Sequence, residues 1–145
     1  MFSYGQQQKA QNYFPMPNEI FHLDLSDGAI LVYAFLMYCE DRKTYQCYPS
    51  YATIGKAIKR SENSVAKYVR ELEEKRLIYT EPTEVTLKDG RRHNGTLLYT
   101  IRPIAEAVEY AYEMQMMHLE AECRHQKVMQ KLQKMQGSIK KQEKA

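Results

Sequence analysis

The sequence predicts a mainly α-helical chain with a small β-hairpin and a long C-terminal helix. Three observations lead to this fold class. Apolar residues recur at three- and four-residue steps over 26–41, 51–58 and 61–75, as they do in amphipathic helices. The pair Asp89-Gly90 lies between two strand-like segments and is a strong signal for a hairpin turn. From Ile104 the helical pattern continues almost to the C-terminus.

The chain is expected to divide into a flexible arm over 1–16, a folded domain over 17–103 and a C-terminal helix over 104–145. The arm is rich in Gln up to Tyr13. Pro15 and Pro17 then exclude a helix interior, because proline lacks the amide proton that a helix needs. Residues 19–23 are expected to form a short helical turn or an extended stretch that packs on the core.

The first long helix is expected to run to Asp41. Its N-cap is Ser26 or Asp27, because the side-chain oxygen of either residue can accept a free amide proton of the first turn. The alternation of polar and apolar residues over 42–48 then predicts a short strand. The residues expected on the apolar stripe of this helix are Ile30, Leu31, Ala34, Phe35 and Tyr38.

Two further helices are expected to meet across a tight turn. The first spans 51–58 after Ser50, and the second runs from the N-cap Ser61 to about Lys75. The turn between them is formed by Lys59 and Arg60. Residues 71–76 are expected to form a solvated, charged face. The residues expected to point inward are Tyr51, Ile54 and Ile58 in the first helix, and Val65, Tyr68 or Val69, and Leu72 in the second.

The hairpin is expected between a strand at 77–79 and a return strand at 96–101, which Pro103 ends. Asp89-Gly90 is one candidate for its tip, and Asn94-Gly95 is a second.

This order of elements resembles a winged helix-turn-helix. It is similar to the replication-initiator-like and regulatory proteins of bacterial plasmids, phages and conjugative elements, most closely over 40–55. It also resembles the GntR-type winged helix, in the Ser-x-x-Ser/Thr-Val pattern of 61–65 and the Leu-Glu-x-x-x-Leu-Ile pattern of 72–78. The resemblance covers about 17–103. It implies that the chain binds duplex DNA with the helix that starts after Ser61 in the major groove.

The resemblance also implies base contacts near the start of that helix. Asn63 would suit adenine and Ser64 a base or a phosphate, whereas Glu62 and Ala66 stand where GntR-type proteins often carry Arg. Affinity is therefore expected from flanking cations and from the hairpin. The DNA-binding residues predicted in this way are Lys56, Lys59, Arg60, Ser61, Glu62, Asn63, Ser64, Ala66, Lys67, Arg70, Lys88, Arg91 and Arg92.

The distribution of charge agrees with this assignment. The net charge is only +3, but residues 42–102 carry thirteen Lys and Arg against seven acidic residues, and residues 1–41 carry one against five. A basic segment is what a phosphate-facing surface requires. A protein-interaction module without DNA binding is the alternative, and regulator and replication initiator are not separated.

Several other classes are not favoured by the sequence. The cysteines Cys39, Cys47 and Cys123 form no close pair, so neither a zinc site nor a disulfide is expected, and reduced thiols fit a cytoplasmic protein. No nucleophile–base set, phosphate loop or cofactor motif is found, so the chain is not expected to be an enzyme. No signal peptide is recognised, and no apolar stretch reaches the ~20 residues of a membrane span.

The C-terminal helix carries an apolar seam with heptad spacing, so a homodimer through this helix is expected. An end near Gly137-Ser138 is expected. Acidic residues lie in its first half and basic residues in its second, which favours antiparallel pairing centred near Ala121. A solvated tail whose basic end touches DNA is the alternative. The seam residues are Ile104, Ala107, Ala111, Met114, His118, Ala121, His125, Val128, Leu132, Met135 and Ile139.

Overall fold

The structure is a computed structural model that describes residues 12–143, so most of the predicted N-terminal arm lies outside the described residues. The chain forms two compact units, one ending at Ala107 and one beginning at Val108. The first unit holds the helices and strands predicted over 17–103, and the second is one continuous stretch of helix.

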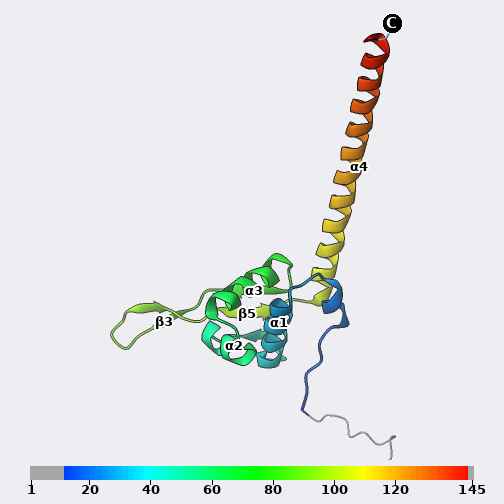
Figure 1. Cartoon of the computed structure of the whole chain (residues 1–145). Coiled ribbons are helices and arrows are strands. Elements are labelled where there is room, and N and C mark those ends of the chain that lie inside the picture. Colours follow the sequence, from blue (N-terminus) through cyan, green and yellow to red (C-terminus); the bar gives the residue numbers. More distant parts are fainter. Residues whose placement is uncertain (1–11, 144–145) are drawn as a thin grey trace, which may run out of the picture. The chain divides into compact units, whose positions relative to one another are not determined.

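The first unit contains a short 3-10 helix and three α-helices (Figure 1). The 3-10 helix η1 spans Asn18–His22, within the segment for which a helical turn or an extended stretch was expected. The α-helices are α1 (Asp27–Cys39), α2 (Tyr51–Ile58) and α3 (Glu62–Glu74). Each begins after a serine whose Oγ accepts an amide proton of the first turn, and these N-caps are Ser26, Ser50 and Ser61.

The predicted inward stripe of α1 is wrong. Leu31 and Tyr38 are 42% and 69% exposed, and Ile30, Ala34 and Phe35 are half-buried. The buried face consists instead of Ala29, Val32, Tyr33 and Leu36. Because α1 is apolar on most of its circumference, spacing alone does not select a face. The face that packs is the one that carries Gly28, where α3 can approach closely.

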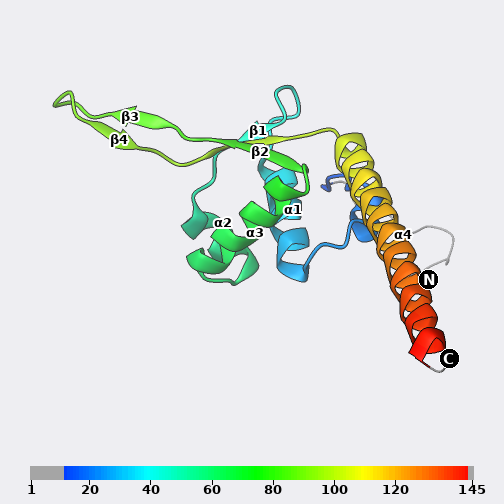
Figure 2. The same ribbon diagram turned by 90° about the horizontal axis from the view of Figure 1, so that it is seen from above.

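The strands form two small antiparallel sheets. The three-stranded sheet has the order β1-β5-β2, with β1 at Gln46–Cys47, β5 at Leu98–Ile101 and β2 at Ile78–Glu81. The second sheet pairs β3 (Glu84–Thr86) with β4 (Arg92–Asn94) and forms the hairpin, which extends beyond β2 and β5 (Figure 2).

The predicted strand over 42–48 is much shorter than expected. Residues 42–45 form a turn, in which the amide of Tyr45 donates to the Asp41 carbonyl at 2.7 Å and Tyr45 has a φ of 58°. Only Gln46 and Cys47 pair with β5. The polar–apolar alternation therefore reflected a turn followed by two paired residues.

The tip of the hairpin lies at Asp89-Gly90. Gly90 has a φ of 83°, a conformation that glycine adopts without the steric cost of a Cβ. The amide of Leu87 donates to the Arg91 carbonyl at 2.8 Å and closes the loop. Asn94-Gly95 is therefore not the tip, since Asn94 ends β4 and Gly95 pairs with Thr83 at the base of the hairpin.

The core lies between the helices and the three-stranded sheet. Val65, Val69 and Leu72 of α3 are buried there, which selects Val69 rather than Tyr68 as the inward residue. Ile54 of α2 and Ile78 of β2 are also buried. Burying an aliphatic side chain of this size stabilises the fold by roughly 1.5–3 kcal/mol, so this core holds α3 firmly.

The long helix α4 spans Ile104–Glu143. Ala107 is buried in the first unit, whereas every residue from Tyr112 to Glu143 is exposed. The predicted end at Gly137-Ser138 is wrong, because the helix continues through Gly137. A glycine in an exposed helix costs only ~1 kcal/mol relative to Ala, which is too little to end this helix. No helix among the described residues is long and apolar enough to cross a membrane.

Candidate nucleic-acid interface

A tight turn joins α2 to α3. Lys59 ends α2 in the left-handed conformation, with a φ of 58°, and the Arg60 amide donates to the Gly55 carbonyl at 2.9 Å. A Cβ at Gly55 would stand 2.6 Å from the Arg60 carbonyl oxygen. Only glycine therefore fits at position 55, and this close approach fixes the angle at which α3 begins.

The solvent-facing side of α3 carries several of the predicted DNA-binding residues. Glu62, Asn63, Lys67 and Arg70 are exposed, and Ala66 is half-buried. Asn63, Lys67 and Arg70 lie three and four residues apart on the side opposite the buried valines, whereas Glu62 and Ala66 lie nearer the edge of the buried face. The helix thus presents a short polar stripe whose side chains are free to reach a ligand.

Ser61 and Ser64 are engaged with each other at the start of α3. The Ser61 Oγ accepts from the Ser64 amide at 3.2 Å and donates to the Ser64 Oγ at 2.9 Å. Ser61 therefore has a capping role, as the sequence predicted. The Ser64 hydroxyl retains its own proton as a donor toward solvent.

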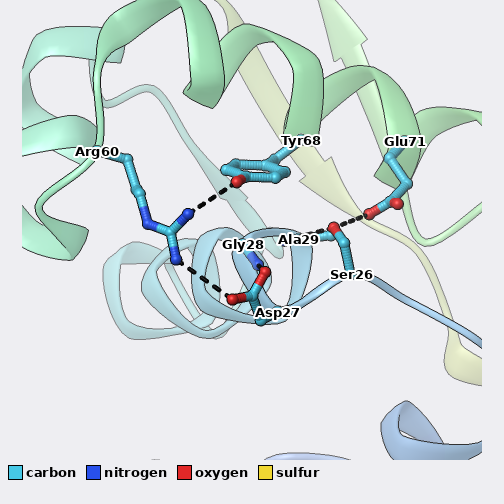
Figure 3. Close-up of polar contacts among 7 residues, drawn as sticks. All are labelled: Ser26, Asp27, Gly28, Ala29, Arg60, Tyr68 and Glu71. Carbon is cyan, nitrogen blue, oxygen red and sulfur yellow. Dashed lines mark hydrogen bonds and ion pairs between the residues drawn. The ribbon is translucent and has the colours of Figure 1, made fainter.

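The structure places Arg60 against α1, where it already has protein partners (Figure 3). Its guanidinium donates to the Tyr68 Oη at 3.0 Å and to Asp27 Oδ2 at 3.3 Å. The carbon of the guanidinium also stands 5.9 Å from the centre of the Tyr68 ring. The Arg60 side chain remains 37% exposed and that of Asp27 81%, so the pair is a surface contact, open to competition from another anion.

The Tyr68 ring lies directly over Gly28 of α1 (Figure 3). A Cβ built on Gly28 would stand 2.0 Å from Tyr68 Cζ. The two helices can approach this closely only because position 28 has no side chain. Gly28 and Asp27 are positioning residues that the sequence analysis missed, and the one available signal was the Asp-Gly pair in the first turn of a predicted helix.

Residues 71–76 do not form the solvated face that was expected. Glu71 Oε2 accepts from the Ser26 Oγ at 2.7 Å, which links α3 to the N-cap of α1 (Figure 3). Glu73 accepts from the Thr80 hydroxyl, and the Lys75 Nζ donates to the Leu23 carbonyl at 3.3 Å. These charged side chains fix the C-terminal end of α3, a role that their residue types alone do not reveal.

The hairpin presents its three predicted cations to solvent. Lys88, Arg91 and Arg92 are all exposed. Arg91 lies 3.6 Å from Asp89, and Arg92 lies 3.8 Å from Glu84. Exposed pairs of this kind are worth little, so both arginines can exchange their carboxylate for a phosphate at small cost.

The base of the hairpin is held by side chains of threonine. The Thr83 Oγ1 donates to the Thr96 carbonyl, and the Thr96 Oγ1 donates to the Tyr48 carbonyl at 2.9 Å. The hairpin is thus attached through its base to the loop before α2, while its tip is held only by its own turn.

Five of the predicted cations have no counter-ion in the part of the chain that the structure describes. Within residues 12–143, no ion pair is formed by Lys56, Lys59, Lys67, Arg70 or Lys88. They lie on α2, the turn, α3 and the hairpin tip. Uncompensated positive charges on these successive elements are available to an anionic partner.

The buried titratable groups do not add a second chemistry. Burial raises the pKa of the Cys47 thiol to about 12 and that of the Tyr33 hydroxyl to about 12, so both stay protonated at neutral pH. Among residues 12–143, no three His, Cys, Asp or Glu side chains are grouped to hold a metal ion.

The helices α2 and α3, their turn and the β3–β4 hairpin make this a winged helix-turn-helix with a long C-terminal helix, which confirms the predicted fold class. Residues 23–78 match the family model described as a helix-turn-helix domain. That match covers α1 to the start of β2 and includes the whole of α2 and α3. No curated protein matches the chain.

Several solved structures are similar in fold. A possible transcriptional regulator from Methanosarcina mazei Go1 is 18% identical, with a TM-score of 0.46 over 71% of this chain and 80% of its own. A mutant of MepR from a multidrug-resistant S. aureus clinical isolate is 16% identical, with a TM-score of 0.42 over 84% of each chain. The S. aureus MepR–DNA complex is 20% identical, with a TM-score of 0.36 over 83% of this chain and 86% of its own.

Proposed function

We propose that this protein binds double-stranded DNA in a sequence-specific manner, with α3 in the major groove and the hairpin against the flanking backbone. The observation that carries the proposal is the exposed stripe on α3, which is formed by Asn63, Lys67 and Arg70. The buried side of the same helix is fixed to the core, so these side chains are presented on a rigid support.

Two groups of residues have different roles in this proposal, base recognition and phosphate contact. Glu62, Asn63, Ser64 and Ala66 lie at the start of α3, the part of a recognition helix that meets base edges. Lys56, Lys59, Lys67 and Lys88 carry positive charge without a counter-ion among the described residues and would contact phosphates, which position the protein but do not specify sequence.

The biological role that we propose is a transcriptional regulator or a replication-initiation-related factor of a bacterial mobile element. It rests on the resemblance over 17–103 and on the helix-turn-helix match over 23–78. The proposal includes a homodimer through α4, because two copies of α3 would read two half-sites and raise specificity.

The test is selection of bound sequences from a random duplex pool by the full chain, followed by affinity measurements at several salt concentrations. We expect an enriched motif. We also expect the logarithm of the affinity to fall linearly with the logarithm of salt concentration, with a slope of about one unit per phosphate neutralised. Lys59→Ala should reduce that slope by about one unit. Lys43→Ala is the matched control, since Lys43 is an exposed lysine in the turn before β1 and should leave the slope unchanged.

Absence of binding to any duplex at low salt would reject the proposal and favour a protein-interaction module. Binding without an enriched motif would retain the electrostatic part and reject sequence-specific reading by α3.

A further inference from the structure

From Met114 onward, the seam of α4 is a helix face without a partner among the described residues. Met114, Val128, Leu132, Met135 and Ile139 are between 41% and 64% exposed. They belong to one series that advances by alternating steps of three and four residues, which is the repeat of a coiled coil. An apolar stripe of this length in water requires a covering surface.

The charges beside the seam identify what covers it. One position of the seven-residue repeat is occupied by Glu106, Glu113 and Glu120, then by Lys127 and Lys134. Arg124 and Lys131 lie next to that row on the same flank. The flank is therefore acidic up to Glu120 and basic from Arg124 to Lys134.

Geometry then selects the direction of the partner. In an antiparallel pair of identical helices, a given flank meets the same flank of the partner, running the other way. The acidic half of one helix would then face the basic half of the other. In a parallel pair, this flank would instead lie against the opposite flank of the partner, which carries mostly uncharged residues such as Gln115, Met129 and Gln136 and offers these charges no complementary row.

We propose that a second copy of this chain binds to α4 in antiparallel orientation, centred between Ala121 and Glu122. This register places Ala111 opposite Leu132, Met114 opposite Met129, and His118 opposite His125. It also brings Glu113 toward Lys131 and Glu120 toward Arg124. At Ala111 and Leu132 a small residue faces a large one, which lets the two helices pack closely there.

Disulfide trapping in the full chain tests this register without any DNA, so its outcome is separate from that of the proposed function. Cys123 is replaced by Ser in every variant, because its thiol is exposed and lies on the side of α4 away from the seam. A disulfide formed there would not report on the seam. Ala121→Cys places a thiol half a residue from the centre, about 1.5 Å from its mate along the axis. Ala111→Cys places its two thiols about 30 Å apart.

We expect the Ala121→Cys chain to form a disulfide-linked dimer on mild oxidation and the Ala111→Cys chain to remain unlinked. Mixing the Ala111→Cys chain with a tagged Leu132→Cys chain should produce a linked heterodimer. Cys123→Ser alone, which retains Cys39 and Cys47, is the negative control. In sedimentation, the unmodified chain should have twice the 17.1 kDa mass of one copy.

Two results would overturn the proposal. A monomeric mass, with neither variant linked, would mean that another partner or solvent covers the seam. A linked Ala111→Cys dimer would mean that the helices pair in parallel.

Discussion

Tyr68 of α3 packs on Gly28 of α1 so closely that a methyl group at position 28 would stand 2.0 Å from the Tyr68 Cζ. This contact sets the distance between the helix that presents the polar stripe and the helix that supports it. The orientation of α3 therefore depends on a residue that lies outside the proposed DNA-contacting set.

Gly28→Ala is expected to destabilise the protein. Tyr68 must move because its ring carbons, not a flexible chain end, occupy the space, and overpacking of this kind costs about 1–3 kcal/mol. Thermal unfolding of the variant measures the loss. Gly137→Ala is the matched control, since nothing lies within 4 Å of a Cβ there, and it should stabilise α4 by about 0.5–1 kcal/mol. Equal stability of Gly28→Ala and the unmodified chain would contradict the ring's position.

Asp27→Asn is expected to strengthen DNA binding two- to fivefold, on the order of one weakened exposed ion pair. The carboxylate of Asp27 holds the Arg60 guanidinium at 3.3 Å, and removing its charge frees Arg60 for a phosphate. Affinity for the selected duplex at fixed salt measures the gain. In the double variant Arg60→Ala/Asp27→Asn, the increase in DNA affinity should disappear. An increase that persists in the double variant would show that Arg60 does not cause it.

Asn63→Ala and Lys67→Ala are expected to weaken DNA binding in different ways. Loss of the Asn63 amide should cost about 1–3 kcal/mol on the preferred base pair and relax the preference there. Loss of the Lys67 ammonium should weaken binding to all duplexes alike and lower the salt slope by about one unit. Repeating the pool selection with each variant separates the two effects, and an unchanged motif for Asn63→Ala would remove Asn63 from the reading residues.

The sequence predicted the elements around this site well and its contacts poorly. Ser26, Ser50 and Ser61 were correct as N-caps because capping is local chemistry, decided within four residues. The predicted buried face of α1 was wrong because that face is selected by Tyr68, which lies 40 positions after Gly28 in the chain. The engagement of Arg60 with Asp27 was missed for the same reason, since no local pattern records a contact between two helices.

The three thiols are expected to differ in reactivity. Burial, and to a lesser degree the nearby Cys39 and Glu40, raise the pKa of Cys47 to about 12 from an ordinary 9.0. Because the thiolate is the reactive form, Cys47 should react at pH 8 only when the protein unfolds. Cys123 is exposed and should react first. Counting modified thiols over time in native buffer and in guanidinium checks the order, with Cys123→Ser as the control that loses the fast phase.

Reversing charge on α4 is expected to weaken self-association. Lys127→Glu with Lys134→Glu would make the row that includes Glu106 and Glu113 acidic from position 106 to position 134. Dimerisation should then weaken roughly tenfold, as a few surface pairs of some tenths of a kcal/mol each predict. Sedimentation at several concentrations measures the change. Glu106→Lys with Glu113→Lys, added to the same chain, should restore the dimer. Failure of this restoration would argue against antiparallel contact along that flank.

Glu62 stands in the first turn of α3, where its negative charge suits the positive end of the helix dipole. On a surface that contacts phosphates, the same carboxylate repels DNA. The repulsion is offset only where a base donates a hydrogen bond from an amino group to Glu62. We therefore expect short residence times on unrelated DNA. The protein would then search for its target more by dissociation and rebinding than by sliding. Glu62→Gln should lengthen the dwell times on non-target DNA that single-molecule experiments measure. It should also slow association with the target.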